Sequence, residues 1–166
     1  AKLTIIDPVG VGQSFGAFMH LTDYDETLVN GKVWSDGAHI ERKLSELTEH
    51  IEKVTQKYLR NRYETISDFN KEAGQMSVPY QFVIISDFPT ALSELALERL
   101  STIINSGPRC GVFTLLYHNA AQKLPVGINE LQLKKNGLFL IENGDSVTVN
   151  GAWTLSGAWD DISLPG

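Results

Sequence analysis

Residues 78–89, with the sequence VPYQFVIISDFP, decide the fold class. Val78 precedes Pro79, and the proline ring disfavours helical backbone at the residue before it. Residues 82–85 are then apolar without a break, which is typical of a central strand buried on both faces of a parallel sheet. We therefore predict a buried strand over residues 80–86 that ends at Asp87.

The same kind of strand recurs on either side of this stretch. Residues 3–6 (LTII) and residues 111–117 (GVFTLLY) predict two further buried strands, and residues 32–34 a short additional one. Amphipathic helical segments separate these strands along the chain. Alternation of this kind indicates an α/β fold with a mostly parallel sheet flanked by helices.

The longest predicted helix follows Asp36, whose side chain can accept hydrogen bonds from the first free amides of a helix. Its apolar residues recur every three or four positions and form one stripe: Ile40, Leu44, Leu47, Ile51, Val54 and Tyr58. A second helix is predicted over residues 66–71, ending near Gly74. A third is predicted from Pro89 to residue 104, closed by Gly107 and Pro108.

The last quarter of the chain has a different pattern. Residues 137–142 and 146–149 predict a β-hairpin around an Asn-Gly or Gly-Asp turn at residues 143–145. The tail beyond it contains Trp153 and Trp159 without a regular pattern. Because 166 residues suffice for one sizeable core, we predict a single domain, with a core at residues 1–125 and residues 126–166 packed on it.

Charge and composition exclude several classes of protein. The net charge of −6 disfavours autonomous binding of nucleic acid. Two local basic groups, one at Lys57, Arg60 and Arg62 and the other at Lys134 and Lys135, are interpreted as solvated. No apolar run of about 18 residues and no signal peptide is present, so we expect a cytoplasmic protein without membrane contact. Because the chain begins with Ala1, we also expect that it was cut from a longer protein.

Three polar side chains follow predicted strands: Asp7, Asp87 and Asn119. The carboxyl ends of parallel strands are where ligands bind in such sheets, and an aspartate after a run of apolar residues is the pattern of a Mg²⁺-associated carboxylate in nucleotide hydrolases. The phosphate-binding motif GxxxxGK[ST] is absent from the chain. Neither GxSxG nor a metal-binding spacing of histidines occurs, and Cys110, although next to Arg109, is interpreted as a buried residue.

Four segments, in this order, resemble the motor core of FtsK/SpoIIIE-type DNA translocases, a RecA-like ATPase family. They cover about seven tenths of the chain and are residues 3–10 (LTIIDPVG), residues 39–74, residues 78–89, and residues 106–119 (SGPRCGVFTLLYHN). The resemblance implies a RecA-like fold that is incomplete at its N-terminus, because the family's phosphate loop lies upstream of the first of these strands.

The resemblance also assigns roles to single residues. Asp87 matches the Walker B aspartate that holds Mg²⁺, and Asn119 stands where the family has a glutamine that senses the nucleotide. Phe88, however, replaces the glutamate that activates water, and Val9 replaces a lysine after Asp-Pro. These losses imply a vestigial nucleotide site at Asp7, Asp87 and Asn119, with no catalytic residue.

The leading hypothesis is a degenerate, non-catalytic module that acts in assembly, regulation or substrate engagement of a larger DNA- or protein-translocating ATPase. It implies no cofactor for this chain, and ATP with Mg²⁺ in a parent that has an intact loop. The partners of this chain would be other modules of the same parent protein. The parent could form a ring-shaped homo-oligomer, and DNA would be bound only through the parent. Two alternatives stay open: a fragment of an active ATP-dependent translocase, and a flavodoxin-like domain that binds a ligand or a protein.

Overall fold

The computed structural model describes residues 1–29, 32–60, 62–119, 121–131, 133, 140–143, 146–149 and 153–156. The chain divides into two compact units, Ala1–Gly127 and Ile128–Gly166. The division falls two residues after the boundary expected from the sequence at residue 125. That the two parts form a single domain stays a prediction.

The first unit is built on a parallel sheet in the order β1-β2-β3. Its strands are β1 (Lys2–Ile6), β2 (Gln81–Phe88) and β3 (Val112–His118). The predicted central strand is therefore central, and the predicted α/β class with a parallel sheet is confirmed. The strand expected at residues 32–34 does not form, because the chain pairs with β1 only at two isolated points, Val29 with Leu3 and Trp34 with Ile6.

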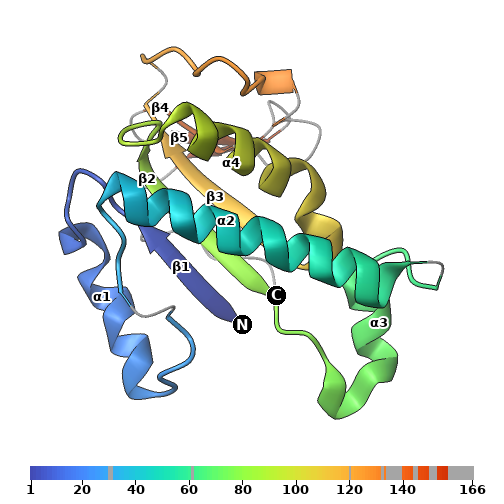
Figure 1. The fold of residues 1–166 in the computed structure, drawn as a ribbon. Helices are drawn as coiled ribbons and strands as arrows, with labels where there is room; N and C mark the ends of the chain where they lie inside the picture. The colour runs from blue at the N-terminus through green and yellow to red at the C-terminus, as the bar shows by residue number, and fades with distance from the viewer. Residues whose placement is uncertain are drawn as a thin grey trace. The chain divides into compact units, whose positions relative to one another are not determined.

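Two long helices cover one face of this sheet, as Figure 1 shows. They are α2 (Gly37–Val54), which lies between β1 and β2, and α4 (Glu94–Ser106), which connects β2 to β3. A crossover between parallel strands is right-handed. The strand order β1-β2-β3 advances in one direction across the sheet, so the two crossovers place both helices on the same face. The predicted stripe of α2 is buried at five positions, Ile40, Leu44, Leu47, Ile51 and Val54, and Asp36 caps the helix by accepting from the His39 amide at 3.1 Å.

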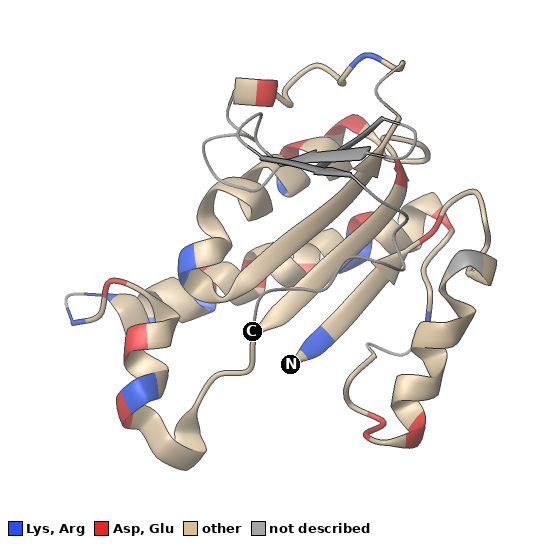
Figure 2. Ribbon diagram, turned by 180° about the vertical axis from the view of Figure 1, so that it is seen from behind, with Lys and Arg blue, Asp and Glu red and all other residues tan. Residues whose placement is uncertain are grey.

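Within this unit the opposite face of the sheet carries no helix, which Figure 2 shows from behind. Side chains there are exposed to different degrees: Phe82 and Phe113 at 39%, Leu115 at 62% and Tyr117 at 65%. The rings of Phe82 and Phe113 stack at 5.6 Å. The expectation that β2 is buried on both faces is therefore wrong for this unit, and β3, expected to be buried, is exposed at alternate residues, because both crossovers fall on one side.

The connecting segments differ in part from the prediction. Helix α3 (Ile66–Ala73) begins with a capping box between Thr65 and Asp68 and ends at Gly74, which has a φ of 54°. Helix α4 begins at Glu94, capped by Ser93, and not at Pro89. Residues 87–90 first form a turn in which the Thr90 amide donates to the Asp87 carbonyl at 2.9 Å.

Short helices complete the first unit. They are η1 (Gln13–Phe15), α1 (Gly16–Met19), η2 (His20–Asp23), the π-helix η3 (Thr55–Leu59), η4 (Gly74–Met76) and η5 (Pro108–Cys110). Among the described residues, none of the helices combines the length and the apolar character needed to cross a membrane.

The second unit contains an antiparallel sheet in the order β4-β5-β6. Its strands are β4 (Leu140–Asn143), β5 (Ser146–Val149) and β6 (Trp153–Ser156), and Asn143 pairs with Ser146 at the end of the first pair. The predicted turn residues Gly144 and Asp145 lie outside the described residues, as does Trp159.

Candidate nucleotide site at the carboxyl edge of the sheet

The parallel register brings the three predicted site residues to one edge of the sheet. Ile6 pairs with Ile85, and Phe88 pairs with His118, so the carboxyl ends of β1, β2 and β3 lie side by side. Asp7 directly follows β1, Asp87 is the penultimate residue of β2, and Asn119 directly follows β3. The residues share an edge, but their side chains have different surroundings.

Asp7 is fully buried, and its carboxylate is occupied by the protein itself. One oxygen accepts from the Gly10 amide at 2.9 Å and from the Ser86 hydroxyl at 2.9 Å, and the other accepts from the Gly12 amide at 3.0 Å. A buried carboxylate is tolerated only when such donors compensate for the loss of water. Asp7 therefore holds its own loop against β2 and does not face a ligand.

The glycine-spaced loop after β1 is closed by the same bonds. The amides of Gly10 and Gly12 point at Asp7, and Gly12 has a φ of 87°, which favours glycine. Val9 and Val11 between them are 59% and 72% exposed. A phosphate loop presents its amides outward to the ligand, whereas these two amides are already bonded to a carboxylate.

Asp87 keeps a carboxylate that the described part of the chain does not bind. It lies half-buried in an irregularity of the β2–β3 pairing, between Ile85 and Phe88, and has a φ of 49°. A positive φ at a residue other than glycine is uncommon and occurs often at functional sites. Of the three predicted residues, Asp87 is the one whose side chain could reach a cation.

Phe88 is a core residue. Its side chain is 1% exposed, and its ring lies 5.8 Å from the imidazole of His118 in an edge-on arrangement. The position that the family resemblance assigns to a water-activating glutamate is therefore filled by a buried aromatic ring. A carboxylate in the same place would be out of contact with water and without a positive partner.

His118 ties the ends of β2 and β3 together. Its Nδ1 lies 2.9 Å from the Phe88 carbonyl oxygen, and its Nε2 lies 3.1 Å from the Gln122 carbonyl oxygen. A neutral imidazole can donate to only one of them at a time, and a protonated one to both. The sequence analysis missed this role, and it missed that of Ser86, since nothing in the local pattern distinguishes either residue from an ordinary strand end.

Asn119 uses its side chain within its own turn. Its Oδ1 accepts from the Ala121 amide at 2.9 Å, and its carbonyl accepts from the Gln122 amide at 2.9 Å. This is the local side-chain-to-backbone bonding that asparagine favours in turns. Within the described residues, no group of three or more histidine, cysteine, aspartate or glutamate side chains could hold a metal ion.

Known structures share this fold. The chain superimposes on the pCW3 conjugation coupling protein TcpA with a TM-score of 0.67 and 17% identity, over 97% of this chain and 53% of TcpA. Its fold is similar to that of FtsK/SpoIIIE-type ATPase modules. At this level of identity the comparison shows the fold alone.

Two further structures agree with that result. ATPases 2 and 3 of EssC from Geobacillus thermodenitrificans give a TM-score of 0.53 at 15% identity, over 81% of this chain and 30% of EssC. The cytoplasmic domain of the type VII secretion ATPase EccC from Thermomonospora curvata gives 0.52 at 16%, over 81% of this chain and 16% of EccC. The chain thus spans about half the length of TcpA and a smaller share of EssC and of EccC. The sequence matches no protein-family model and no curated protein.

Proposed function

We propose that this chain is a non-catalytic module of the FtsK/SpoIIIE type, which acts in assembly, regulation or substrate engagement of a larger translocating ATPase. The observation that carries the proposal is the burial of Phe88 directly after Asp87 at the end of the central strand. A general base must lie within hydrogen-bonding reach of the water that it activates. A buried phenyl ring has no group that could serve.

The surroundings of Asp7 support the same reading. Its carboxylate and the amides of Gly10 and Gly12 bond to one another, so the glycine-spaced loop has these donors directed inward. The loop after β1 therefore cannot substitute for a phosphate loop, whose amides and lysine point outward. The preserved sheet together with altered chemistry is what a module with a structural or regulatory role would retain.

The carboxylate of Asp87, which has no partner among the described residues, favours a second candidate. If a phosphate loop precedes this chain in the parent protein, Asp87 would hold Mg²⁺ beside ATP, and the parent would be an active DNA or protein translocase. In that case the water-activating group would have to come from a residue other than Phe88. The relatives include a conjugation coupling protein and a secretion ATPase, so the polymer moved by such a parent could be DNA or protein.

Calorimetric titration of the chain with Mg-ATP, together with an assay for released phosphate, tests the first candidate. The second is separated from it by the roughly 40 residues that precede Leu3 in the parent protein, which must contain GxxxxGK[ST] if the parent is active. The proposal expects no binding tighter than millimolar and phosphate release equal to that of buffer. Circular dichroism and a cooperative thermal transition would establish that the sample is folded. Micromolar binding that Asp87→Asn abolishes would overturn the proposal in favour of the active translocase.

A further inference from the structure

A cavity of about 480 Å³ lies at the opposite edge of the sheet from Asp7, Asp87 and Asn119. Four of its lining residues come from η3 and the position after it, Thr55, Gln56, Leu59 and Arg60, and one, Arg109, comes from η5. Because η5 ends two residues before β3 begins, the cavity lies at the amino edge of the sheet.

The charge around this cavity departs from that of the chain as a whole. Residues 53–63 contain four basic residues, Lys53, Lys57, Arg60 and Arg62, and no aspartate or glutamate, whereas the chain has a net charge of −6. Arg109 adds a fifth positive charge from a different part of the sequence. Of these basic residues, Arg60 and Arg109 line the cavity itself, and none of the described acidic residues does. Two positive side chains without an acidic one in the described lining favour an anionic ligand.

The arginines that line the cavity differ from the other arginines in their ion pairs. Three of the five arginines lie within 4.0 Å of a glutamate: Arg42 with Glu46, Arg62 with Glu72 and Arg99 with Glu41. Arg60 and Arg109 have no ion pair in the described part of the chain, and both line the cavity. The arginines without an internal carboxylate are thus brought together by the fold, from positions 49 residues apart in sequence (109 − 60).

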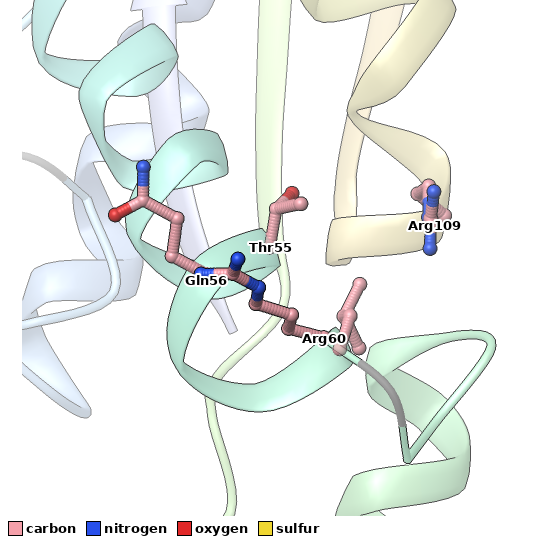
Figure 3. A pocket seen from close by; sticks show the side chains of 5 residues that line it. Thr55, Gln56, Arg60 and Arg109 are labelled. Carbon is pink, nitrogen blue, oxygen red and sulfur yellow. The ribbon is translucent and has the colours of Figure 1, made fainter.

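The two guanidinium groups do not converge on one point. Figure 3 shows Arg60 extending back along its own helical turn, while Arg109 stands on the other side of Thr55. The buried side chain of Leu59 contributes an apolar surface, and the Thr55 hydroxyl is held 3.3 Å from the Cys110 sulfur. A ligand that satisfies both arginines must carry negative charges at two separated places.

We propose that this cavity binds a small linear polyphosphate, with one phosphoryl group at Arg60 and another at Arg109. The planar guanidinium presents paired donors that match phosphate oxygens in a bidentate manner. The site is independent of the nucleotide edge, so it does not rest on the proposed catalytic inactivity.

Titration with sodium tripolyphosphate at low ionic strength, without Mg²⁺, tests this site. The expected result is saturable binding of one tripolyphosphate per chain, which Arg60→Gln and Arg109→Gln each weaken by about threefold to tenfold, a range set by the exposure of both side chains. Binding weakens as salt is added, because exposed charges are screened. Orthophosphate binds at least about tenfold more weakly than tripolyphosphate, since it reaches only one arginine.

Arg42→Gln is the matched control, because it removes the same charge from α2, about 18 Å before the C-terminal end of that helix at 1.5 Å per residue. Arg42→Gln is expected to bind tripolyphosphate as tightly as the unmodified chain does. The same is expected of Asp87→Asn, which lies at the opposite edge of the sheet. Equal losses in Arg42→Gln and Arg60→Gln would show non-specific attraction and overturn the proposal. Citrate binding as tightly as tripolyphosphate, or a single-stranded oligonucleotide binding more tightly through the same two arginines, would also overturn it.

Discussion

The Ser86 hydroxyl donates a hydrogen bond of 2.9 Å to the Asp7 carboxylate across the neighbouring strands β1 and β2. The two residues are 79 positions apart in sequence, and both are buried. Together with the bonds from the Gly10 and Gly12 amides, this bond occupies the Asp7 carboxylate. Asp7 therefore stabilises the end of β1 and does not face a ligand.

Asp7→Asn is expected to destabilise the chain by about 2 kcal/mol. Both carboxylate oxygens of Asp7 accept hydrogen bonds, and in asparagine an NH₂ group would replace one of these oxygens and face an N–H or O–H donor. Urea denaturation measures the change. Asp36→Asn is the matched control, since asparagine caps a helix as well as aspartate does. Asp36 is exposed, and its partners are the amide of His39 at 3.1 Å and the Nδ1 of the same residue at 3.2 Å. Equal stabilities of the two variants would contradict the structural role of Asp7.

Phe88→Glu is expected to destabilise the chain by about 3–5 kcal/mol without creating ATP hydrolysis. The side chain is 1% exposed, so the substitution removes core packing and places a carboxylate in an apolar site. Phe88→Leu keeps the apolar character and should cost less, about 1–2 kcal/mol. Phosphate release by Phe88→Glu above that of the unmodified chain would show that the position can still support chemistry.

His50 on α2 is expected to make stability depend on pH. Its Nε2 is buried without a hydrogen-bond partner in the described part of the chain, and burial, followed by the charges of Lys2 and Lys53, holds the pKa of His50 below the ordinary value of 6.5. The unfolded chain therefore takes up this proton at a higher pH than the folded chain does. The free energy of unfolding is therefore largest, as far as His50 is concerned, above about pH 6.5. It decreases as the pH falls below that value, until His50 is protonated in the folded chain as well.

The slope from this one group stays below about 1.4 kcal/mol per pH unit, because one imidazole binds at most one proton more in the unfolded than in the folded state. Urea denaturation between pH 5.5 and 7.5 measures it. In His50→Gln this component of the slope should disappear, whereas His20→Gln, at a side chain that is 82% exposed, should leave it in place. An unchanged slope in His50→Gln would contradict the assignment.

Gly107→Ala is expected to destabilise the chain by more than about 2 kcal/mol. A Cβ at this position would overlap the carbonyl oxygen of Ile103 and lie 2.6 Å from that of Val112, where β3 begins. Neither backbone can move without disturbing α4 or the sheet. Gly16→Ala is the control, because a Cβ there meets nothing within 4 Å, and alanine in α1 should be neutral or stabilise by up to about 1 kcal/mol. Thermal unfolding compares the two.

The sequence by itself determined the elements whose cause is local. The three- and four-residue spacing from Ile40 to Val54 defined the buried face of α2, Asp36 defined its start, and the unbroken apolar run at residues 82–85 identified the central strand. These predictions succeeded because side-chain periodicity and capping depend on neighbours within a few residues. The start of α4 at Glu94 was missed because a turn intervenes after β2.

Only the tertiary structure decided what the polar residues at the strand ends do. Asp7 and Asp87 look alike in sequence, each following an apolar strand, yet one is saturated by Ser86 and the glycine amides while the other has no bond in the described part of the chain. Likewise, Arg60 and Arg109 come to line the same cavity only after the chain has folded. The physical reason is that burial and hydrogen bonding are properties of partners distant in sequence, which local pattern does not encode.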